Sequence, residues 1–324
     1  MSKQLPLTQK VPHCSQLVFG CMGLGGDWNE PNYSLNDVAV ANRAIDTALE
    51  VGISMFDHAD IYTRGKAEQV FGDVLKQRPH LRKDMTIQTK CGIRFEDDKG
   101  PGRYDFSKEW ILHSVETSLK RLNIEQIDIL LLHRPDPLME PDEVASAFDQ
   151  LVKQGKVNKF GVSNMTSAQM QLLQQALPNP LVCNQLEISL GHLDCIDQGI
   201  IANVGGEATY NAMAGTLEYC QLNDVQVQSW GSLSQGLFSG RILDGQAPHI
   251  ITTASLVSSL AAEYQTSPEA IVLAFLTRLP QGIQPVIGTV DPDRIRACQR
   301  VIEVELTREH WYQLFVAARG RFVP

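Results

Sequence analysis

One short segment of the chain, residues 56–68 (FDHADIYTRGKAE), contains several side chains that can transfer protons. Asp57 and Tyr62 are five positions apart, and Lys66 follows Tyr62 by four positions. A free tyrosine has a pKa of about 10, and a nearby ammonium group lowers this pKa because it favours the tyrosinate. A tyrosine beside a lysine can therefore act as a general acid or base. The spacing alone leaves open whether Tyr62 works with Lys66 or, together with Asp57, with a lysine from elsewhere in the chain.

Eight short apolar segments predict β-strands that could position such a group. Several are apolar almost throughout, as expected of parallel strands that are covered on both faces. The segments span residues 17–22, 53–57, 85–91, 127–133, 157–163, 181–186, 225–230 and 284–289.

The intervals between these segments carry helix patterns. Residues 38–49 form an apolar stripe that ends before Gly52, and residues 107–123 place apolar side chains at helical spacing. Signals for helix N-termini follow at TSAQ, SPEA and DPDR, which begin at positions 166, 267 and 291. Eight alternations of strand and helix, with no antiparallel meander, predict an α/β fold, a single (β/α)8 TIM barrel domain over residues 1–324.

Three segments lie outside this eightfold pattern. TQKVPHCSQ, residues 8–16, is expected to form an N-terminal β-hairpin that closes one end of the barrel, and residues 307–320 are expected to form an additional C-terminal helix. Residues 187–208 are longer than an ordinary connection after a strand. This segment either contacts the substrate or forms a partly helical excursion on the surface.

The composition narrows the functional class. The chain has 324 residues, 43% of them hydrophobic, and its net charge of -9 argues against nucleic acid or an anionic membrane as a partner. The seven cysteines include no C-x-x-C pair, so neither a disulfide framework nor a metal site is expected. No apolar stretch is long enough for a membrane span or a signal peptide, and we therefore expect a cytoplasmic location.

Polar groups follow the predicted strands at equivalent positions. In a (β/α)8 barrel, side chains at the carboxyl ends of the strands face the active-site mouth. Taken singly, each group could be a turn cap, a solvated strand end or a core histidine, but together they favour an active site. On six consecutive strands they are Asp57, Lys90, His133, Ser163 with Asn164, Asn184 with Gln185, and Trp230.

Several stretches resemble signature segments of the aldo-keto reductase superfamily, in the order of that superfamily and from about residue 16 onward: GISMFDHADIY, TKCG, LLLHRPDP, LVKQGKVNKFGVSN, NQLEIS and PVIGT. The likeness is to bacterial reductases of the general kind. It implies a (β/α)8 barrel that binds NADPH without a Rossmann domain and reduces aldehydes or ketones to alcohols. The catalytic tetrad of the superfamily falls on Asp57, Tyr62, Lys90 and His133.

This resemblance favours one of the two tyrosine pairings. A Tyr62–Lys66 pair would be that of a short-chain dehydrogenase, which needs a Rossmann glycine loop after the first strand. GCMGLGGD, residues 20–27, lacks the G-x-G-x-x-G order, and no acidic residue follows a second strand at the expected place. We therefore expect Lys66 in the first turn of the second helix and Lys90 beside Tyr62.

The resemblance also implies roles for the site residues. Tyr62 is expected to donate a proton to the nascent alkoxide, Asp57 to orient Lys90, and His133 to bind the substrate oxygen. The residues expected to contact a small carbonyl substrate are Trp28, Tyr62 and His133. The residues expected to bind the cofactor are Gly20, Cys21, Met22, Asp57, Ser163, Asn164, Gln185, Trp230, Gly231, Ser232, Leu233, Gly236, Gly288, Thr289 and Arg294.

The preference for NADPH over NADH depends on the 2′-phosphate site. DPDR opens a helix whose N-terminus suits a phosphate, and the planar fork of Arg294 can bind that phosphate through two hydrogen bonds. Many members of the superfamily have Lys-Ser where this chain has Gly288 and Thr289. One cation is therefore missing, and we expect NADPH as the cofactor with NADH less favoured.

Two other functions are compatible with parts of this pattern. A regulatory or structural protein could keep the fold and the cofactor with little turnover, as channel-associated β-subunits of the superfamily do, but the intact tetrad argues against it. An unrelated (β/α)8 enzyme such as a sugar isomerase would place paired acids or metal ligands at the strand ends. Asp57 is the one carboxylate in the proposed group.

Overall fold

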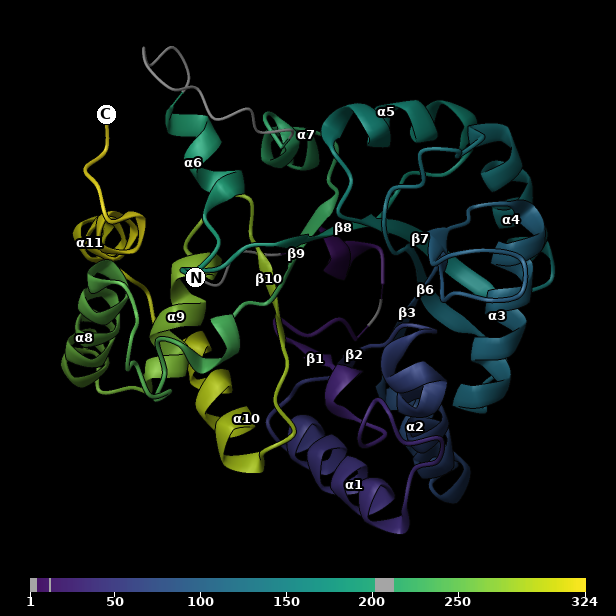
Figure 1. Cartoon of the computed structure of the whole chain (residues 1–324), viewed down its shortest axis with the longest axis horizontal. Coiled ribbons are helices and arrows are strands. Elements are labelled where there is room, and N and C mark those ends of the chain that lie inside the picture. The colour runs from purple at the N-terminus through teal and green to yellow at the C-terminus, as the bar shows by residue number, and fades with distance from the viewer. Residues whose placement is uncertain (1–4, 12, 202–212) are drawn as a thin grey trace.

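The computed structural model describes residues 5–11, 13–201 and 213–324. In it, eight parallel strands close into a barrel in the order β1, β10, β9, β8, β7, β6, β3 and β2 (Figure 1). All eight predicted strands are confirmed, with bounds that agree within two residues. They are β1 (Val18–Gly20), β2 (Met55–Asp57), β3 (Thr86–Cys91), β6 (Ile127–Leu132), β7 (Val157–Ser163), β8 (Cys183–Glu187), β9 (Gln226–Trp230) and β10 (Gln284–Ile287).

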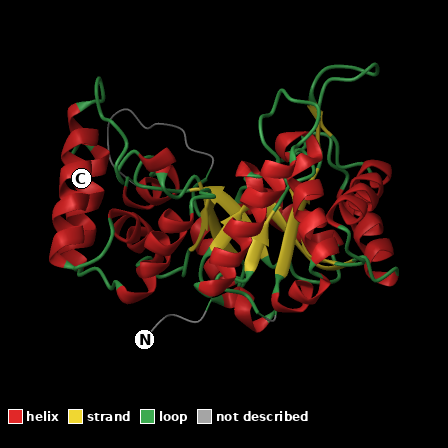
Figure 2. Cartoon of the chain, turned by 90° about the horizontal axis from the view of Figure 1, so that it is seen from below, coloured by secondary structure: helices red, strands yellow, loops and turns green. Residues whose placement is uncertain are grey.

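Helices surround the strands, as a side view shows (Figure 2). Neighbouring helices pack on one another around the barrel, and the predicted C-terminal helix, α11, packs on α8. The helices are α1 (Leu35–Glu50), α2 (Lys66–Gln77), α3 (Lys108–Leu122), α4 (Pro141–Lys153), α5 (Ser167–Ala176), α6 (Asp194–Ile200), α7 (Thr216–Leu222), α8 (Pro248–Glu263), α9 (Pro268–Thr277), α10 (Pro292–Gln299) and α11 (Arg308–Arg319).

Local sequence explains where several helices begin. Thr166 caps α5 in a capping box with Gln169, as the TSAQ pattern predicts. Ser267 caps α9 and Asp291 caps α10, and in both cases proline occupies the first helical position. These ends are set by side-chain acceptors for N–H groups that the helix itself leaves unpaired.

The expected N-terminal β-hairpin is wrong. Among the described residues of this segment, Pro6–Gln9 form a short 3-10 helix, η1, and only turns and irregular backbone follow before β1. Leu7 and Val11 are buried against Val18 and Val286 at the bottom of the barrel. A single turn that delivers two apolar side chains closes this end, so the chain needs no pair of strands to cover it.

Two excursions were not predicted from the sequence. A two-stranded hairpin, β4 (Ile93–Arg94) with β5 (Arg103–Tyr104), follows β3, and α8 precedes the eighth strand–helix unit. The long segment after β8 contains α6 in its described part, and residues 202–212 lie outside the described residues. None of the described helices is long and apolar enough to cross a membrane.

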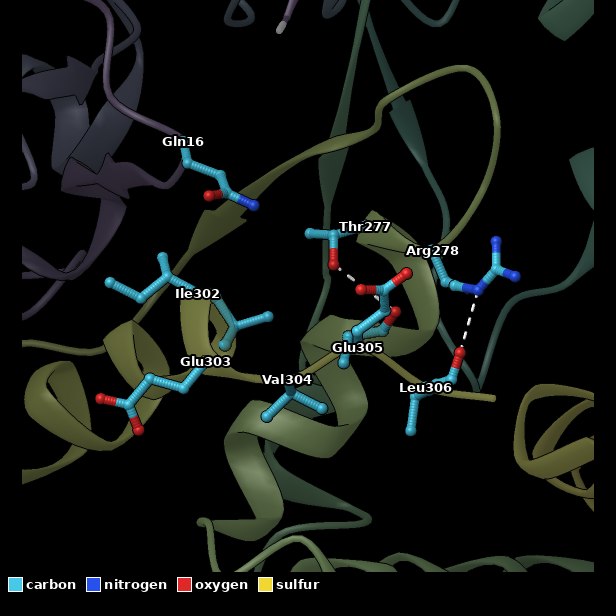
Figure 3. A pocket seen from close by; sticks show the side chains of 10 residues that line it. Gln16, Thr277, Arg278, Ile302, Glu303, Val304, Glu305 and Leu306 are labelled. Atoms are coloured by element: carbon cyan, nitrogen blue, oxygen red, sulfur yellow. Dashed lines mark hydrogen bonds between the residues drawn. The ribbon is translucent and has the colours of Figure 1, made fainter. Parts of the chain in front are cut away.

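A cavity of about 240 Å³ lies at the amino end of the barrel, between the end of α9 and residues 301–306 (Figure 3). Gln16, which precedes β1, lines it. The Arg278 side chain in its wall donates a 2.9 Å hydrogen bond to the Leu306 carbonyl. This cavity is at the amino ends of the strands, whereas the side chains expected to do chemistry are at the carboxyl ends.

Candidate active site

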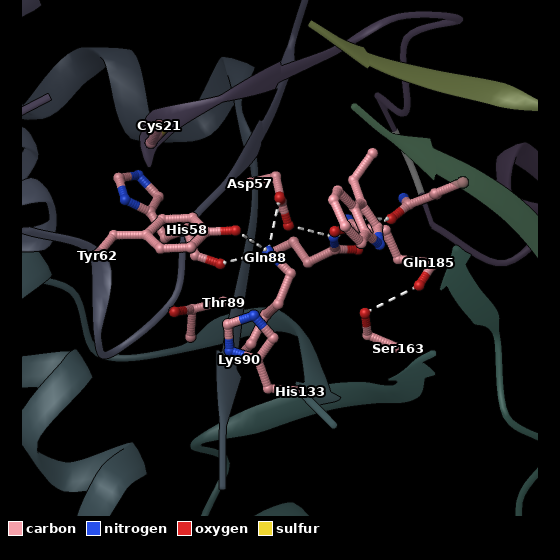
Figure 4. Close-up of polar contacts among 12 residues, drawn as sticks. Cys21, Asp57, His58, Tyr62, Gln88, Thr89, Lys90, His133, Ser163 and Gln185 are labelled. Carbon is pink, nitrogen blue, oxygen red and sulfur yellow. Dashed lines mark hydrogen bonds and ion pairs between the residues drawn. The ribbon is translucent and has the colours of Figure 1, made fainter. Parts of the chain in front are cut away.

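Three of the predicted side chains converge where β2 and β3 end (Figure 4). The Lys90 ammonium group donates to Asp57 Oδ2 at 2.7 Å, to the Tyr62 hydroxyl at 2.9 Å and to the His58 carbonyl at 2.9 Å. Lys90 is fully buried and Asp57 is 2% exposed. All three N–H donors of the ammonium group are therefore used, which a buried cation requires.

The charge of Lys90 is stable in this setting. Burial by itself lowers the pKa of the Lys90 ammonium, but the charge of Asp57 and the hydrogen bonds to Asp57 and Tyr62 outweigh burial, so the pKa lies above its ordinary value. Asp57 receives a second hydrogen bond, 2.5 Å long, from the Gln88 amide. Both carboxylate oxygens thus have a partner, and Asp57 with Lys90 forms a closed, neutral pair.

Tyr62 is held with its proton available. Its oxygen accepts the hydrogen bond from Lys90, so the tyrosine's own O–H can point to another acceptor. Burial raises the pKa of Tyr62 above its ordinary value, and Asp57 adds to the rise. Lys90 lowers this pKa, as expected, but by less than burial raises it. Tyr62 therefore carries its proton at neutral pH.

His133 lies on the other side of Tyr62. The two rings meet edge to face with centres 6.0 Å apart. Burial, followed by the charges of Lys90 and Arg134, lowers the pKa of His133 well below its ordinary value, so the ring is neutral. Its Nδ1 atom is buried without a hydrogen-bond partner in the described part of the chain.

The turn that carries Tyr62 is fixed from behind by residues that sequence reasoning missed. Arg121 of α3 donates to the Asp60 carbonyl at 2.9 Å and pairs with buried Glu68 at 3.5 Å. Glu68 also accepts a 2.8 Å hydrogen bond from Thr89, the neighbour of Lys90. Backbone strain accompanies this arrangement, because the two non-glycine residues after Tyr62 both have positive φ.

A second group missed from the sequence is a layer of buried glutamines beneath the site. Gln228 accepts from Gln88 at 2.9 Å and from Gln185 at 3.0 Å, and it donates to Gln284 at 3.0 Å. Because Gln88 also binds Asp57, this layer links the Asp57–Lys90 pair to Gln185 across the barrel. The only sequence signal was glutamine within otherwise apolar strands.

The polar residues after β7 form one connected unit. The Asn164 amide donates to Ser163 Oγ at 2.9 Å and to the His133 carbonyl at 3.2 Å, and its oxygen accepts from the Trp230 indole at 3.0 Å. Ser163 donates in turn to the Gln185 carbonyl at 2.8 Å. The structure therefore brings the predicted nicotinamide-binding residues together beside His133.

Arg294 lies at the other end of the predicted cofactor site. Its guanidinium donates to the Ser239 hydroxyl at 3.4 Å in the loop after β9, and it pairs with Glu269 of α9 at 3.5 Å. A Cβ at Gly236 would come within 3.1 Å of the same guanidinium. The side chain is 42% exposed. Residues 231–233 of the same loop begin at Gly231, whose φ is positive, and include buried Ser232 and half-buried Leu233.

The N-terminus of α10 differs from the expectation. The Asp291 carboxylate accepts from the backbone N–H groups of Asp293 and Arg294, and Thr289 accepts from the N–H of Asp291. The donors expected to bind a phosphate are thus already occupied by the helix cap, and the carboxylate repels a second anion. The Arg294 side chain and the open backbone at Gly288 remain for this purpose.

The residues at the end of β1 and in the loop after it include both buried and exposed side chains. Gly20 is required by packing, since a Cβ there would come within 2.9 Å of the Ile287 carbonyl. Cys21 is fully buried, whereas Met22 is 55% and Trp28 is 38% exposed. Of these side chains, Met22 and Trp28 can reach a ligand as the structure stands.

Lys66 does not contact the Tyr62 hydroxyl and has a structural role. It is the first residue of α2, as predicted, and is 3% exposed. Its ammonium group donates to the carbonyls of Asp27 and Glu30, in the loop that carries Trp28. Lys90, not Lys66, contacts Tyr62.

Lys66→Met is expected to lower the free energy of unfolding by roughly 1.5–3 kcal/mol, the usual contribution of hydrogen bonds to a charged group. Since Lys66 does not contact Tyr62, kcat should stay within a few-fold of wild type. Urea unfolding and initial rates measure the two effects, with Lys76→Met on the exposed face of α2 as the control. A loss of kcat as large as that caused by removing the Tyr62 hydroxyl would contradict this placement.

Comparison with known proteins agrees with the geometry. The family model for the aldo/keto reductase family matches residues 16–315. The chain is 35% identical over 327 residues to oxidoreductase YdhF of Escherichia coli, covering all of both chains. It is 33% identical over 326 residues to a 6-dehydroglucose reductase of Agrobacterium fabrum, covering 99% of each. The crystal structure of an aldo/keto reductase from Klebsiella pneumoniae in complex with NADP and acetate superposes with a TM-score of 0.71 at 21% identity, covering 93% of this chain and 90% of that one.

The protein is an NAD(P)H-dependent oxidoreductase of the class that reduces carbonyl groups, built on a (β/α)8 barrel. The chain belongs to the aldo/keto reductase family.

Proposed function

We propose that this protein reduces aldehydes or ketones to alcohols with NADPH, and that Tyr62 donates the proton. The observation that carries the proposal is the 2.9 Å hydrogen bond from Lys90 to the Tyr62 oxygen, which leaves the tyrosine's own O–H free to donate, while burial keeps Tyr62 protonated. The neutral His133 ring, 6.0 Å from the Tyr62 ring, supplies a second hydrogen-bonding group for the same substrate oxygen.

The cofactor-binding residues have groups suited to a nicotinamide dinucleotide. The nicotinamide supplies the hydride when it is bound. Asn164 carries an amide against the partly exposed Trp230, a combination that can bind a carboxamide and stack on an aromatic ring, and Ser163 links Asn164 to Gln185. At the far end, Arg294 presents a half-exposed guanidinium to a phosphate.

In the proposed mechanism, each residue of the chain has a separate task. Tyr62 transfers its proton to the developing alkoxide, and the Lys90 ammonium stabilises the tyrosinate that forms. Asp57 keeps Lys90 charged and in place, while Gln88 keeps Asp57 in place. In the reverse direction, the tyrosinate accepts the proton from an alcohol.

The test is a panel of aldehydes and ketones offered with NADPH and with NADH, with consumption of the reduced nucleotide as the readout. We expect turnover of generic aldehydes such as 4-nitrobenzaldehyde and a higher kcat/KM with NADPH. Tight NADPH binding with no turnover of any carbonyl compound would favour the regulatory function instead. The cytoplasmic location, the single domain over residues 1–324 and a contact between residues 187–208 and the substrate stay predictions.

Arg294→Ala is expected to weaken NADPH binding roughly tenfold to a hundredfold, because a charge-assisted contact to the 2′-phosphate is lost. NADH lacks that phosphate, so its affinity should change little and the ratio of the two affinities should approach one. Quenching of tryptophan fluorescence measures both, with Trp230 as the reporter.

Arg296→Ala is the matched control, since Arg296 lies on the same helix but pairs with Glu50 and Asp293. It should leave both affinities unchanged. Equal weakening of NADPH and NADH by Arg294→Ala would mean that Arg294 contacts the shared pyrophosphate or only supports α10.

A further inference from the structure

Two arginines flank the candidate active site without an ion-pair partner in the part of the chain that the structure describes. Arg134 directly follows His133, and its guanidinium lies 5.5 Å from the ring centre of Trp230. Arg64 follows Tyr62 by two positions, and its guanidinium lies 5.0 Å from the ring centre of Phe95. A cation–π contact leaves the N–H groups at the edge of a guanidinium free to bind something else.

The other ionisable groups of the site do not neutralise these cations. Lys90 and Asp57 cancel each other, Tyr62 carries its proton and His133 is neutral. His58, which lies behind them, is neutral as well, because burial and the charge of Lys90 lower its pKa to about 3. Among these groups, Arg134 and Arg64 therefore keep a positive charge that no other group cancels, although the whole chain has a net charge of -9.

Two acidic residues, Asp136 and Glu187, lie at the same ends of the strands as Arg134 but form no ion pair with it among the described residues. Asp136 accepts from the backbone N–H groups of Phe106 and Leu138. Glu187 pairs in register with Trp230 at the end of β8, and its carboxylate lies where a Cβ on Gly231 would meet it at 3.7 Å. Arg134 is half-buried, so an unneutralised charge there is costly and would be offset by an anionic ligand.

We propose that the carbonyl substrate carries an anionic group, a carboxylate or a similar oxyanion, and that Arg134 binds this group. The proposal rests on the proposed reductase function and adds the substrate class to it. The planar fork of Arg134 matches two carboxylate oxygens, and its position next to His133 places the anion a few bonds away from the carbonyl that reacts. Arg64, on the Tyr62 side, adds a second positive charge to the entrance.

The experiment compares two aldehydes of the same shape, 4-carboxybenzaldehyde and its neutral methyl ester, with NADPH at saturation. Wild type is expected to prefer the acid by roughly tenfold or more in kcat/KM, and Arg134→Gln to remove this preference by lowering kcat/KM for the acid roughly tenfold to a hundredfold. Most of that loss should be a rise in KM. The ester should change by less than about threefold, since it has no charge to lose.

Arg43→Gln is the matched control, because it removes the same charge from an exposed site on α1. It should leave the preference for the acid intact. Three results would overturn the proposal: a wild-type preference for the ester, an equal loss for both aldehydes in Arg134→Gln, or a tenfold loss of NADPH affinity in that variant. The second would mean that Arg134 only supports Trp230, and the third that it serves the cofactor.

A binding measurement separates this proposal from the reductase function on which it rests. The alcohol products, 4-(hydroxymethyl)benzoate and its methyl ester, are titrated against tryptophan fluorescence in the presence of NADP⁺. If no aldehyde is reduced but the acid still binds at least tenfold more tightly to wild type than to Arg134→Gln, the reductase function fails and the anion site stands. If both aldehydes are reduced but Arg134→Gln binds the two products as wild type does, the reductase function stands and the anion site fails.

Discussion

Tyr62→Phe is expected to reduce aldehydes roughly 10²- to 10⁴-fold more slowly than wild type while it still binds NADPH. The substitution deletes the proton donor but keeps the ring that meets His133 edge to face. The loss should appear in kcat, because proton transfer occurs in the chemical step and the hydroxyl is not required to hold the nucleotide.

Initial rates on several aldehydes and a fluorescence titration with NADPH measure the two properties. Tyr312→Phe, which removes a hydroxyl from α11 far along the chain, is the control and should behave as wild type. Turnover by Tyr62→Phe at the wild-type rate would mean that another group donates the proton. The mechanism proposed here would then be wrong, although the family assignment would stand.

Asp57→Leu is expected to lower the free energy of unfolding by roughly 3–5 kcal/mol and to abolish activity. It leaves the Lys90 ammonium buried without a compensating charge, which is the costly way to break a buried ion pair. Asp57→Leu combined with Lys90→Met should recover most of the lost stability, since an apolar pair of similar volume is often tolerated. The double variant should stay inactive. Urea unfolding of both variants measures these effects.

The stability difference between Asp57→Leu and wild type is expected to change with pH in a definite direction. In wild type the pKa of Lys90 is raised, so the stability it contributes is present below the unfolded pKa of about 10.4 and is lost only above it. In Asp57→Leu, burial is the largest effect that remains and only Tyr62 opposes it, so we expect the folded pKa of Lys90 to fall below the unfolded value. The unfolded chain then binds more protons, so the variant should gain stability relative to wild type as the pH rises toward 10. A stability difference that does not change with pH would contradict an unpaired Lys90 cation.

The relation between sequence and structure differs from element to element. The eight strands could be predicted because each is a short apolar run with polar residues at its end, and this pattern is set within the strand itself. The starts of α5, α9 and α10 could be predicted because the capping side chain lies within three residues of the N–H that it accepts from. The family resemblance likewise rests on short, contiguous stretches.

Interactions between distant parts of the chain could not be predicted in this way. Gln88 and Gln228 are 140 positions apart, and only the closed barrel places their side chains in contact beneath the Asp57–Lys90 pair. Arg121 supports the Tyr62 turn from α3, although nothing around Arg121 in the sequence indicates a partner at Asp60. The β-hairpin expected at the N-terminus was a wrong prediction for a related reason. The shape of the opening at the bottom of the barrel decides which segment can close it, and Leu7 and Val11 fill this opening.

The sequence by itself therefore determined the strand and helix pattern, the chemical groups at the strand ends and the family, because these depend on residues close to one another along the chain. Only the tertiary structure decided that Lys66 donates to the carbonyls of Asp27 and Glu30, and that Tyr62 holds its proton more tightly than a free tyrosine. It also decided that Asp291 occupies the N-terminus of α10 and that Arg134 is left without an ion pair among the described residues. These outcomes depend on burial and on the distances between charged groups, and both quantities are fixed only when the barrel has closed.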